Sequence, residues 1–167
     1  MCKNSVLLRD IITKYHPVWK KYPDIHSFMI NSPRSFNVEH LIEVCLAHVG
    51  GYNFVDEAGY DFDDPVWSDS KTLSVNVKSY RAELGNLANK IGALRITIYN
   101  PHSDKVDFMY MTFDEWNEYK RSCYGKNQED KTRLVMSWNK KDHYNQFEKF
   151  RLKSFKELAR CQRTQPL

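Results

Sequence analysis

The chain has 167 residues, a net charge of +4, 41% hydrophobic and 14% aromatic residues, so it can bury the core of one domain and is not a disordered chain. It has no run of about 18 apolar residues, and its charged N-terminal stretch is unlike a signal peptide, so we expect a cytoplasmic protein without a membrane segment. Its four cysteines are widely spaced, which argues against both a disulfide framework and a thiolate zinc site.

The N-terminal part of the chain is expected to be helical. Residues 5–15 predict a short amphipathic helix, and residues 17–35, which contain three prolines, predict irregular structure with one helical turn. Residues 37–49 predict the clearest helix, because their apolar side chains recur at i, i+3, i+4 and i+7. These side chains are Val38, Leu41, Ile42, Cys45, Leu46 and Val49.

The middle of the chain is expected to alternate strands with a helix. Residues 52–55 and 72–78 predict strands, and residues 81–91 predict a short helix. Residues 93–99 and 105–111 predict a hairpin across an Asn-Pro turn. The hydrophobic residues of the second strand, which alternate with polar ones and are expected to face inward, are Leu73, Val75 and Val77.

The C-terminal part is expected to add a helix over residues 113–123, a short strand over 134–138 and a final helix over 142–161. The whole order predicts a mixed α/β fold with a central mixed sheet flanked by helices and a helical, basic C-terminal region. We expect residues 1–123 to form the core with its N-terminal extension, and residues 124–167 to pack on that core.

Charge is distributed unevenly along the chain. Residues 1–119 contain 12 Lys or Arg and 16 Asp or Glu, whereas residues 120–167 contain 13 and 5. A basic region beside an acidic one is typical of an enzyme that acts on nucleic acid, so we expect a nucleic acid as the partner. The expected DNA-binding side chains are Lys140, Lys141, Lys149, Lys153, Lys156 and Arg160.

The acidic part is concentrated in residues 56–78, whose carboxylates are followed by two lysines in the segments Asp69-Ser70-Lys71 and Asn76-Val77-Lys78. Carboxylate oxygens are ligands that Mg²⁺ prefers, and a nearby lysine can act on a phosphate or a water. Some of these carboxyl groups must have raised pKa values when no cation is present, because like charges disfavour ionisation. The alternative is an exposed acidic loop beside solvated lysines.

This arrangement resembles the restriction-endonuclease-like nuclease superfamily, known as PD-(D/E)xK, over about residues 37–111. That family has a core helix, then a sheet with one Asp on its second strand and a (D/E)-x-Lys on its third. The usual Pro-Asp is reversed here as Asp64-Pro65. The family's additional glutamate, on the first core helix, corresponds to Glu43 or Glu39.

Two registers fit the resemblance. In the first, Asp61, Asp63 or Asp64 combines with Asn76 and Lys78, with Asn76 in the acid position. In the second, Asp69 and Lys71 supply the acid and the lysine, with Asp61 or Asp63 upstream. Across both registers, the implied metal residues are Asp63, Asp64, Asp69 and Asn76, and the implied catalytic residues are Lys78, Lys71 and Glu43.

The resemblance implies an Mg²⁺-dependent DNA endonuclease of phage, mobile-element or restriction type. Cutting both strands of a duplex favours a homodimer. The alternative is a DNA-binding regulator that keeps the scaffold without cutting, and a third is an RNA-binding or RNA-cleaving protein. The sequence has no Walker loop and no Gly-x-Gly-x-x-Gly loop, so we expect no nucleotide cofactor. It also has no His-x-x-x-His or Cys/His pair, so we expect no zinc site.

Overall fold

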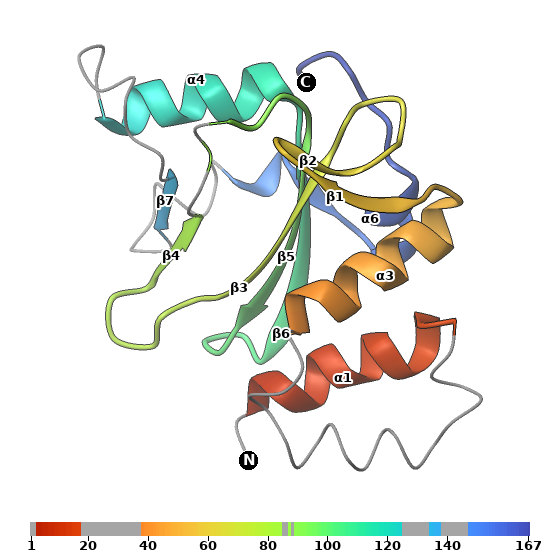
Figure 1. The fold of residues 1–167 in the computed structure, drawn as a ribbon. Helices are drawn as coiled ribbons and strands as arrows, with labels where there is room; N and C mark the ends of the chain where they lie inside the picture. Colours follow the sequence, from red (N-terminus) through yellow and green to blue (C-terminus); the bar gives the residue numbers. More distant parts are fainter. Residues whose placement is uncertain (1–2, 18–37, 85–86, 88, 125–133, 138–146) are drawn as a thin grey trace.

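The computed structural model describes most of the chain, and Figure 1 shows how its elements are arranged. The described residues are 3–17, 38–84, 87, 89–124, 134–137 and 147–167. The helices are α1 (Lys3–Tyr15), α3 (Val38–Gly50), α4 (Phe113–Tyr124) and α6 (Phe155–Arg160). The strands are β1 (Phe54–Glu57), β2 (Tyr60–Phe62), β3 (Asp69–Ser74), β4 (Arg81–Leu84), β5 (Leu94–Asn100), β6 (Lys105–Met111), β7 (Leu134–Ser137) and β8 (Arg151–Leu152).

The main sheet has the strand order β3-β5-β6-β8. Strands β3 and β5 are parallel, whereas the β5–β6 and β6–β8 pairs are antiparallel. Strands β1 and β2 form a separate antiparallel hairpin, and β4 pairs with β7 in a second small sheet. The mixed α/β fold that the sequence predicts is therefore confirmed.

Two hydrophobic clusters lie on opposite faces of the main sheet. One contains Leu94 and Ile96 of β5, together with side chains from α4, β4 and β7. The other joins α1, α3 and α6 to the sheet through residues such as Tyr110 of β6. In Figure 1, α1, α3 and α6 accordingly lie on one side of the sheet, and α4 with the β4–β7 pair lies on the other. All seven residues of β5 are buried, because both faces of this strand are covered.

Several predicted elements are confirmed with small shifts at their ends. The helix expected over 37–49 is α3, and the helices expected over 5–15 and 113–123 are α1 and α4. The hairpin expected over 93–99 and 105–111 is β5–β6. These segments have long, regular hydrophobic patterns, which are the most informative signals in a sequence.

The helix predicted over residues 81–91 is wrong, because residues Arg81–Leu84 form β4 and the described residues 87 and 89–91 are not helical. Arg81 and Glu83 are exposed, whereas Ala82 and Leu84 are buried, so the segment follows the two-residue period of a strand. A stretch of four residues is too short to separate this period from a helical one, and pairing with β7 decides the structure.

The strand predicted over residues 72–78 is displaced toward the N-terminus, because β3 ends at Ser74. The chain then turns, and the Asn76 side-chain oxygen accepts hydrogen bonds from the backbone N–H groups of Lys78 and Ser79, both at 2.9 Å. Val77, which was expected to face inward, is 64% exposed in this turn. An Asn side chain that bonds the backbone two and three residues later competes with strand pairing.

The single helix predicted over residues 142–161 is also wrong within the described residues. Residues 151–152 form β8, which pairs with β6, and α6 begins only after Ser154. Phe147 and Phe150 belong to one hydrophobic cluster, whereas Phe155 belongs to the cluster on the opposite face of the sheet. One continuous helix cannot reach both faces, so the chain crosses the sheet edge between them. The expected boundary at residue 123 lies beside residues 125–133, which are outside the described residues.

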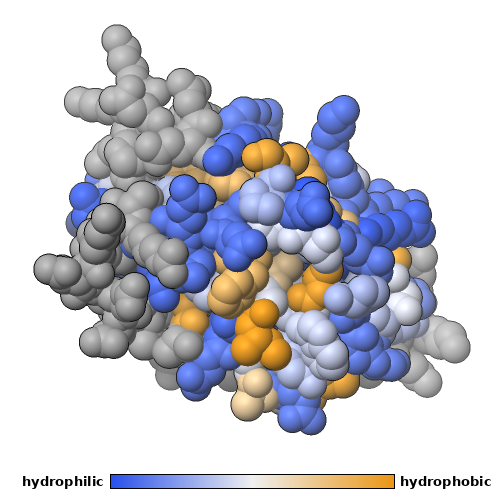
Figure 2. All heavy atoms as spheres, turned by 90° about the horizontal axis from the view of Figure 1, so that it is seen from above, coloured by the Kyte–Doolittle hydropathy of each residue, from blue (hydrophilic) through white to orange (hydrophobic). Residues whose placement is uncertain are grey.

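No helix in the described part of the chain is long and apolar enough to cross a membrane. Some large hydrophobic side chains nevertheless remain exposed on the surface. Those of the internal segments are Trp67, Val77, Tyr80, Ile91 and Phe113. In the view from above in Figure 2, hydrophobic atoms form small groups separated by hydrophilic side chains.

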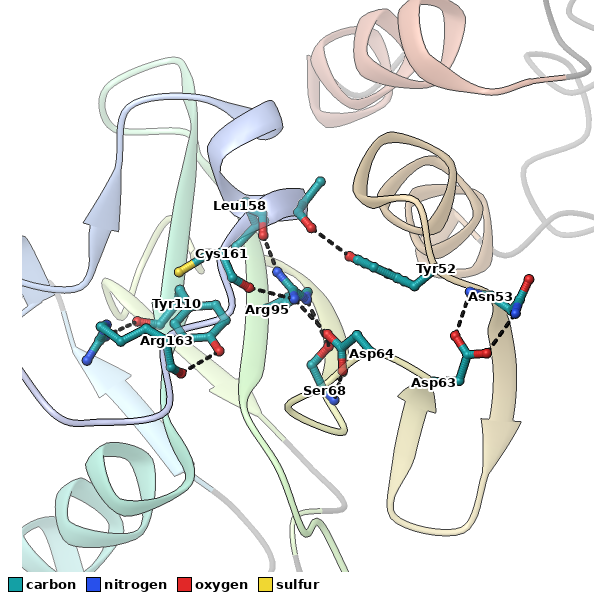
Figure 3. Close-up of polar contacts among 11 residues, drawn as sticks. Tyr52, Asn53, Asp63, Asp64, Ser68, Arg95, Tyr110, Leu158, Cys161 and Arg163 are labelled. Atoms are coloured by element: carbon teal, nitrogen blue, oxygen red, sulfur yellow. Dashed lines mark hydrogen bonds and ion pairs between the residues drawn. The ribbon is translucent and has the colours of Figure 1, made fainter.

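A buried arginine connects the loop between β2 and β3 to the C-terminal segment (Figure 3). Arg95, in β5, is fully buried and forms an ion pair at 2.7 Å with the buried carboxylate of Asp64. It also donates hydrogen bonds to the Ser68 hydroxyl at 2.8 Å, to the Cys161 carbonyl at 2.7 Å and to the Leu158 carbonyl. A buried charge is tolerated only when it is paired and hydrogen-bonded, and these partners satisfy that requirement.

Two tyrosines surround the same guanidinium group. The rings of Tyr52 and Tyr110 lie 5.2 and 5.3 Å from the central carbon of Arg95. Their hydroxyl groups donate hydrogen bonds to the carbonyls of Ala159 and Arg163, at 3.0 and 2.8 Å. The arginine and both rings therefore hold the C-terminal residues against the sheet.

We expect Asp64→Asn to destabilise the protein by about 3 kcal/mol, because it leaves the buried Arg95 charge without its anionic partner. The free energy of unfolding, measured by urea denaturation, checks this value. Asp63→Asn is the matched control: Asp63 is exposed and its carboxylate bonds Asn53, so this variant should lose much less stability than Asp64→Asn. Equal losses in the two variants would contradict this assignment.

Candidate functional site

The candidate site lies at the outer edge of the main sheet, where β3 meets the N-terminal half of α3 and the end of β2. Asp69 and Lys71 are two residues apart in β3, so their side chains leave the same face of the strand. The Lys71 ammonium lies 2.7 Å from Asp69 Oδ1 and donates a hydrogen bond to the Ser70 carbonyl at 2.9 Å. Asp69 is 1% exposed, so this ion pair is shielded from water.

Asp61, in β2, is anchored to the free edge of β3. The Asp69 N–H bonds the Ala93 carbonyl beside β5, so the N–H of the next residue, Ser70, points away from β5. Asp61 Oδ2 accepts this second N–H at 2.7 Å. The Asp61 carboxylate thus takes the place of a neighbouring strand's carbonyl, which fixes it beside Asp69.

Helix α3 contributes two glutamates, one turn apart. Glu39 Oε1 lies 3.8 Å from the Lys71 ammonium. Glu43 is buried, and its Oε2 lies 3.5 Å from Nδ1 of the half-exposed His40. Because residues i and i+4 share one face of a helix, both glutamates face the same region of β3.

A second lysine reaches the site from a different segment. The Lys90 ammonium contacts Asp69 Oδ2, so each Asp69 oxygen has a lysine as its partner. Lys90 lies in the connection between β4 and β5. We call Glu39, Glu43, Asp61, Asp69, Lys71 and Lys90 the acidic cluster.

Negative charge is in excess in the acidic cluster, and the pKa values of its members reflect this excess. Burial, helped by the neighbouring charges of Asp61, Glu39 and Asp69, raises the pKa of Glu43 to about 8. Burial and the Asp69 charge likewise raise the pKa of Asp61 to about 6. Burial opposes the charge of Lys71, but Asp69, Glu39 and Asp61 outweigh this effect, and the pKa of Lys71 is raised. Two carboxyl groups therefore lack sufficient compensating positive charge.

The second of the two registers brings its residues together. Asp61, Asp69, Lys71, Glu43 and Glu39 all belong to the acidic cluster.

Apart from Asp61, which both registers share, the residues of the first register lie elsewhere. Asp63 is exposed, and two hydrogen bonds from Asn53 lower its pKa. Asp64 is paired with Arg95, which places its carboxylate in the structural network of Figure 3. Asn76 and Lys78 lie in the exposed turn after β3.

The expected DNA-binding residues are spread over several elements instead of one helix. Lys149 and Lys153 flank β8, and Lys156 and Arg160 lie one turn apart on α6. All four are exposed. Lys140 and Lys141 lie outside the described residues.

No group of three or more His, Cys, Asp and Glu side chains among the described residues is arranged as a metal site as it stands. In the acidic cluster, lysine ammonium groups occupy both oxygens of Asp69, and the Ser70 N–H occupies one oxygen of Asp61. A metal ion would therefore have to replace at least one of these contacts.

Two charged residues of the structure were not anticipated from the sequence. Lys90 is 19 positions after Lys71, in a segment that was predicted to be helical, and no spacing rule connects the two. Arg95 carried a usable signal, since an arginine inside the apolar segment ALRITIY needs a buried acidic partner.

Comparison of the chain with models of protein families, with curated proteins and with solved structures found no significant match.

We expect Glu43→Gln to stabilise the protein increasingly as the pH rises. The native pKa of Glu43 is about 8, above its ordinary value of 4.5, so its contribution to stability is full below pH 4.5 and is lost as the pH rises through 8. Glutamine cannot ionise and avoids this loss. The gain over the wild type should be small at pH 4 and reach a few kcal/mol at pH 9, since each unit of pKa shift is worth about 1.4 kcal/mol.

Urea denaturation in EDTA at pH 4, 7 and 9 measures this gain. Glu118→Gln, at an exposed position of α4, is the control for loss of a negative charge. A gain that is the same at all three pH values would contradict the assignment of Glu43 to a cluster with excess negative charge.

Proposed function

We propose that the protein is a metal-dependent endonuclease that hydrolyses phosphodiester bonds in double-stranded DNA. The observation that carries the proposal is the convergence of Asp61, Asp69 and Lys71 at one sheet edge, with Glu43 of the preceding helix beside them. These residues come from three elements and have the types and order that the nuclease resemblance implies.

The order of elements supports a restriction-endonuclease-like core. Helix α3 comes first, Asp61 lies on the second strand after it, and the Asp69-Ser70-Lys71 segment lies on the third. The next part differs from the expected order, because the connection from β3 to β5 contains strand β4 where a helix was predicted over residues 81–91. Strand β4 packs with β7 on the far side of the sheet from α3, whereas Lys90 of the same connection reaches Asp69; the order of Glu43, Asp61, Asp69 and Lys71 along the chain is unaffected.

The acidic cluster fits a divalent cation by its donor chemistry and its charge. Glu43, Asp61 and Asp69 supply carboxylate oxygens, which are suited to Mg²⁺. The raised pKa values of Glu43 and Asp61, together with the repulsion between the carboxylates, indicate that added positive charge would be favourable here. A bound Mg²⁺ would lower the pKa of a water and stabilise negative charge on the phosphate.

Lys71 has a role of its own beside this ion. Its ammonium group is held by Asp69 and by the Ser70 carbonyl, so its position is set before a substrate arrives. A fixed positive charge at this point stabilises charge that develops on a phosphoryl oxygen without the cost of reorganisation. The raised pKa of Lys71 keeps it charged at neutral pH.

Binding of DNA would use the exposed cations of the C-terminal region. Lys156 and Arg160 lie on α6, which packs against α3, the helix that carries Glu43. Lys149 and Lys153 flank β8, three strand spacings from β3, or roughly 14 Å. This separation is comparable to the major groove width of about 12 Å, so one duplex could contact both places. Cleavage of both strands would favour a homodimer.

One observation favours a second function, that of a DNA-binding regulator without catalytic activity. Both oxygens of Asp69 already have lysine partners, so the cluster is partly neutralised without a metal ion. If no ion displaces these lysines, the same surface binds DNA and leaves it intact.

Incubation with supercoiled plasmid in Mg²⁺ or in EDTA tests the proposal. We expect nicking or linearisation in Mg²⁺ only, and a loss of about 100-fold or more in Asp69→Asn and Lys71→Met, because each removes a group that acts on the reacting phosphate. Asp63→Asn and Lys78→Met are matched controls from the first register and should retain activity. Circular dichroism of each variant verifies the fold.

The outcomes separate the two functions. A mobility shift without cleavage under every divalent ion tried would support the regulator. Activity that survives Asp69→Asn and Lys71→Met but not Asp63→Asn and Lys78→Met would move the site to the exposed turn after β3.

A further inference from the structure

The two carboxylate oxygens of Asp69 contact lysines from two different segments of the chain. Lys71 belongs to the Asp69-Ser70-Lys71 segment and contacts Oδ1 at 2.7 Å, whereas Lys90 belongs to a separate segment and contacts Oδ2. Asp69 is 1% exposed, and no hydrogen-bond donor other than these ammonium groups reaches either oxygen within the described residues. The ammonium groups of the two lysines are therefore the groups that compensate the negative charge of this buried carboxylate.

The backbone around Lys90 is fastened to the segment that leads into β3. The N–H of Ile91 bonds the Gly59 carbonyl at 3.4 Å, and the N–H of Ala93 bonds the Val66 carbonyl at 3.2 Å. Gly59 has a φ of +104°, and a Cβ there would lie 2.5 Å from the Asn89 carbonyl oxygen, so only glycine permits this approach. The backbone position of Lys90 is thus fixed by the fold.

The side chain itself is free to leave without disturbing this backbone. A lysine ammonium is a point charge on a flexible four-carbon stem, and rotation about that stem breaks no backbone hydrogen bond. The Lys90 side chain is 14% exposed, so it has a route to solvent.

We infer that Lys90 is a built-in counter-cation of Asp69, which a divalent ion must displace in order to bind at this carboxylate. The inference rests on the proposed function, because it concerns the metal-binding step of the same site. Oxygen lone pairs that contact an ammonium group are not available to a metal ion, and two cations at one carboxylate repel each other. Lys90 therefore raises the divalent ion concentration at which the site fills.

Ion binding by Lys90→Met tests the inference without any measurement of cleavage. Methionine retains much of the stem and removes the charge. We expect isothermal titration with Mn²⁺ or Mg²⁺ alone to give a dissociation constant at least about tenfold lower than that of the wild type, because the competing charge is gone. Lys78→Met removes an equal charge in an exposed turn and should leave the dissociation constant unchanged.

A second measurement uses the unaltered protein. Acylation of lysine amines, followed by mass spectrometry, should label Lys90 slowly in EDTA and several-fold faster in saturating Mg²⁺, since displacement exposes the amine. Lys78 should be labelled equally in both conditions. This readout remains available if Lys90→Met does not fold.

The possible results distinguish a failure of this inference about Lys90 from a failure of the proposed nuclease function. If the wild type binds the ion but Lys90→Met binds it no more tightly and Lys90 labelling does not change, the inference is overturned and the proposed nuclease stands. If neither protein binds a divalent ion, the metal-dependent function and the inference both fail. Weaker binding in Lys90→Met would make Lys90 a support for Asp69 instead of a competitor.

Discussion

The ion pair between Arg95 and Asp64 is the constraint on which the rest of the structure depends. Both side chains are fully buried, and the pair connects three parts of the chain: the loop after β2, strand β5, and α6 with the residue that follows it. Asp61 precedes this loop and Asp69 follows it, so the loop determines how these two carboxylates meet. A buried pair of this kind contributes little net stability but strongly penalises arrangements that separate it, and so it favours one position of the loop.

Neighbouring carboxylates differ in how fully their negative charge is compensated, and this difference distinguishes structural carboxylates from candidate functional ones. Asp64 is fully compensated by a guanidinium group and a serine, and Asp69 by two lysines. Asp61 accepts a backbone N–H and Glu43 lies beside a half-exposed histidine, but burial and the neighbouring carboxylates raise the pKa values of both. A fold optimised for stability alone would not bury carboxyl groups in this state. Unbalanced charge of this kind is typical of functional sites, and here it occurs at one sheet edge.

The sequence predicted the parts of the fold that have long, regular patterns, such as α3 and the β5–β6 hairpin. It failed where tertiary contacts decide, as in Arg81–Leu84, whose strand form depends on β7 some 50 residues later. For the site, local composition indicated acids and lysines but could not choose between two registers. The choice depends on Asn76, which turns the chain instead of extending the strand, and on Arg95, which takes Asp64 out of the acidic cluster. Lys90 was not predictable, because its contact with Asp69 arises only from the folded path of the chain.

The parallel register of β3 and β5 explains why the Arg95–Asp64 network and the acidic cluster lie close together without sharing a residue. Asp69 lies opposite Leu94, and Ser70 lies opposite Arg95. The N–H of Ser70 anchors Asp61 at the strand edge, while Arg95 holds the loop from the neighbouring strand. Because side chains alternate between the faces of a sheet, a slip of one residue in β3 would exchange the face of Asp69 and Lys71 with that of Ser70 and Thr72. Burial of Arg95 with its single acidic partner opposes such a slip, so the same interaction that fixes the fold also keeps Asp69 and Lys71 together in the acidic cluster.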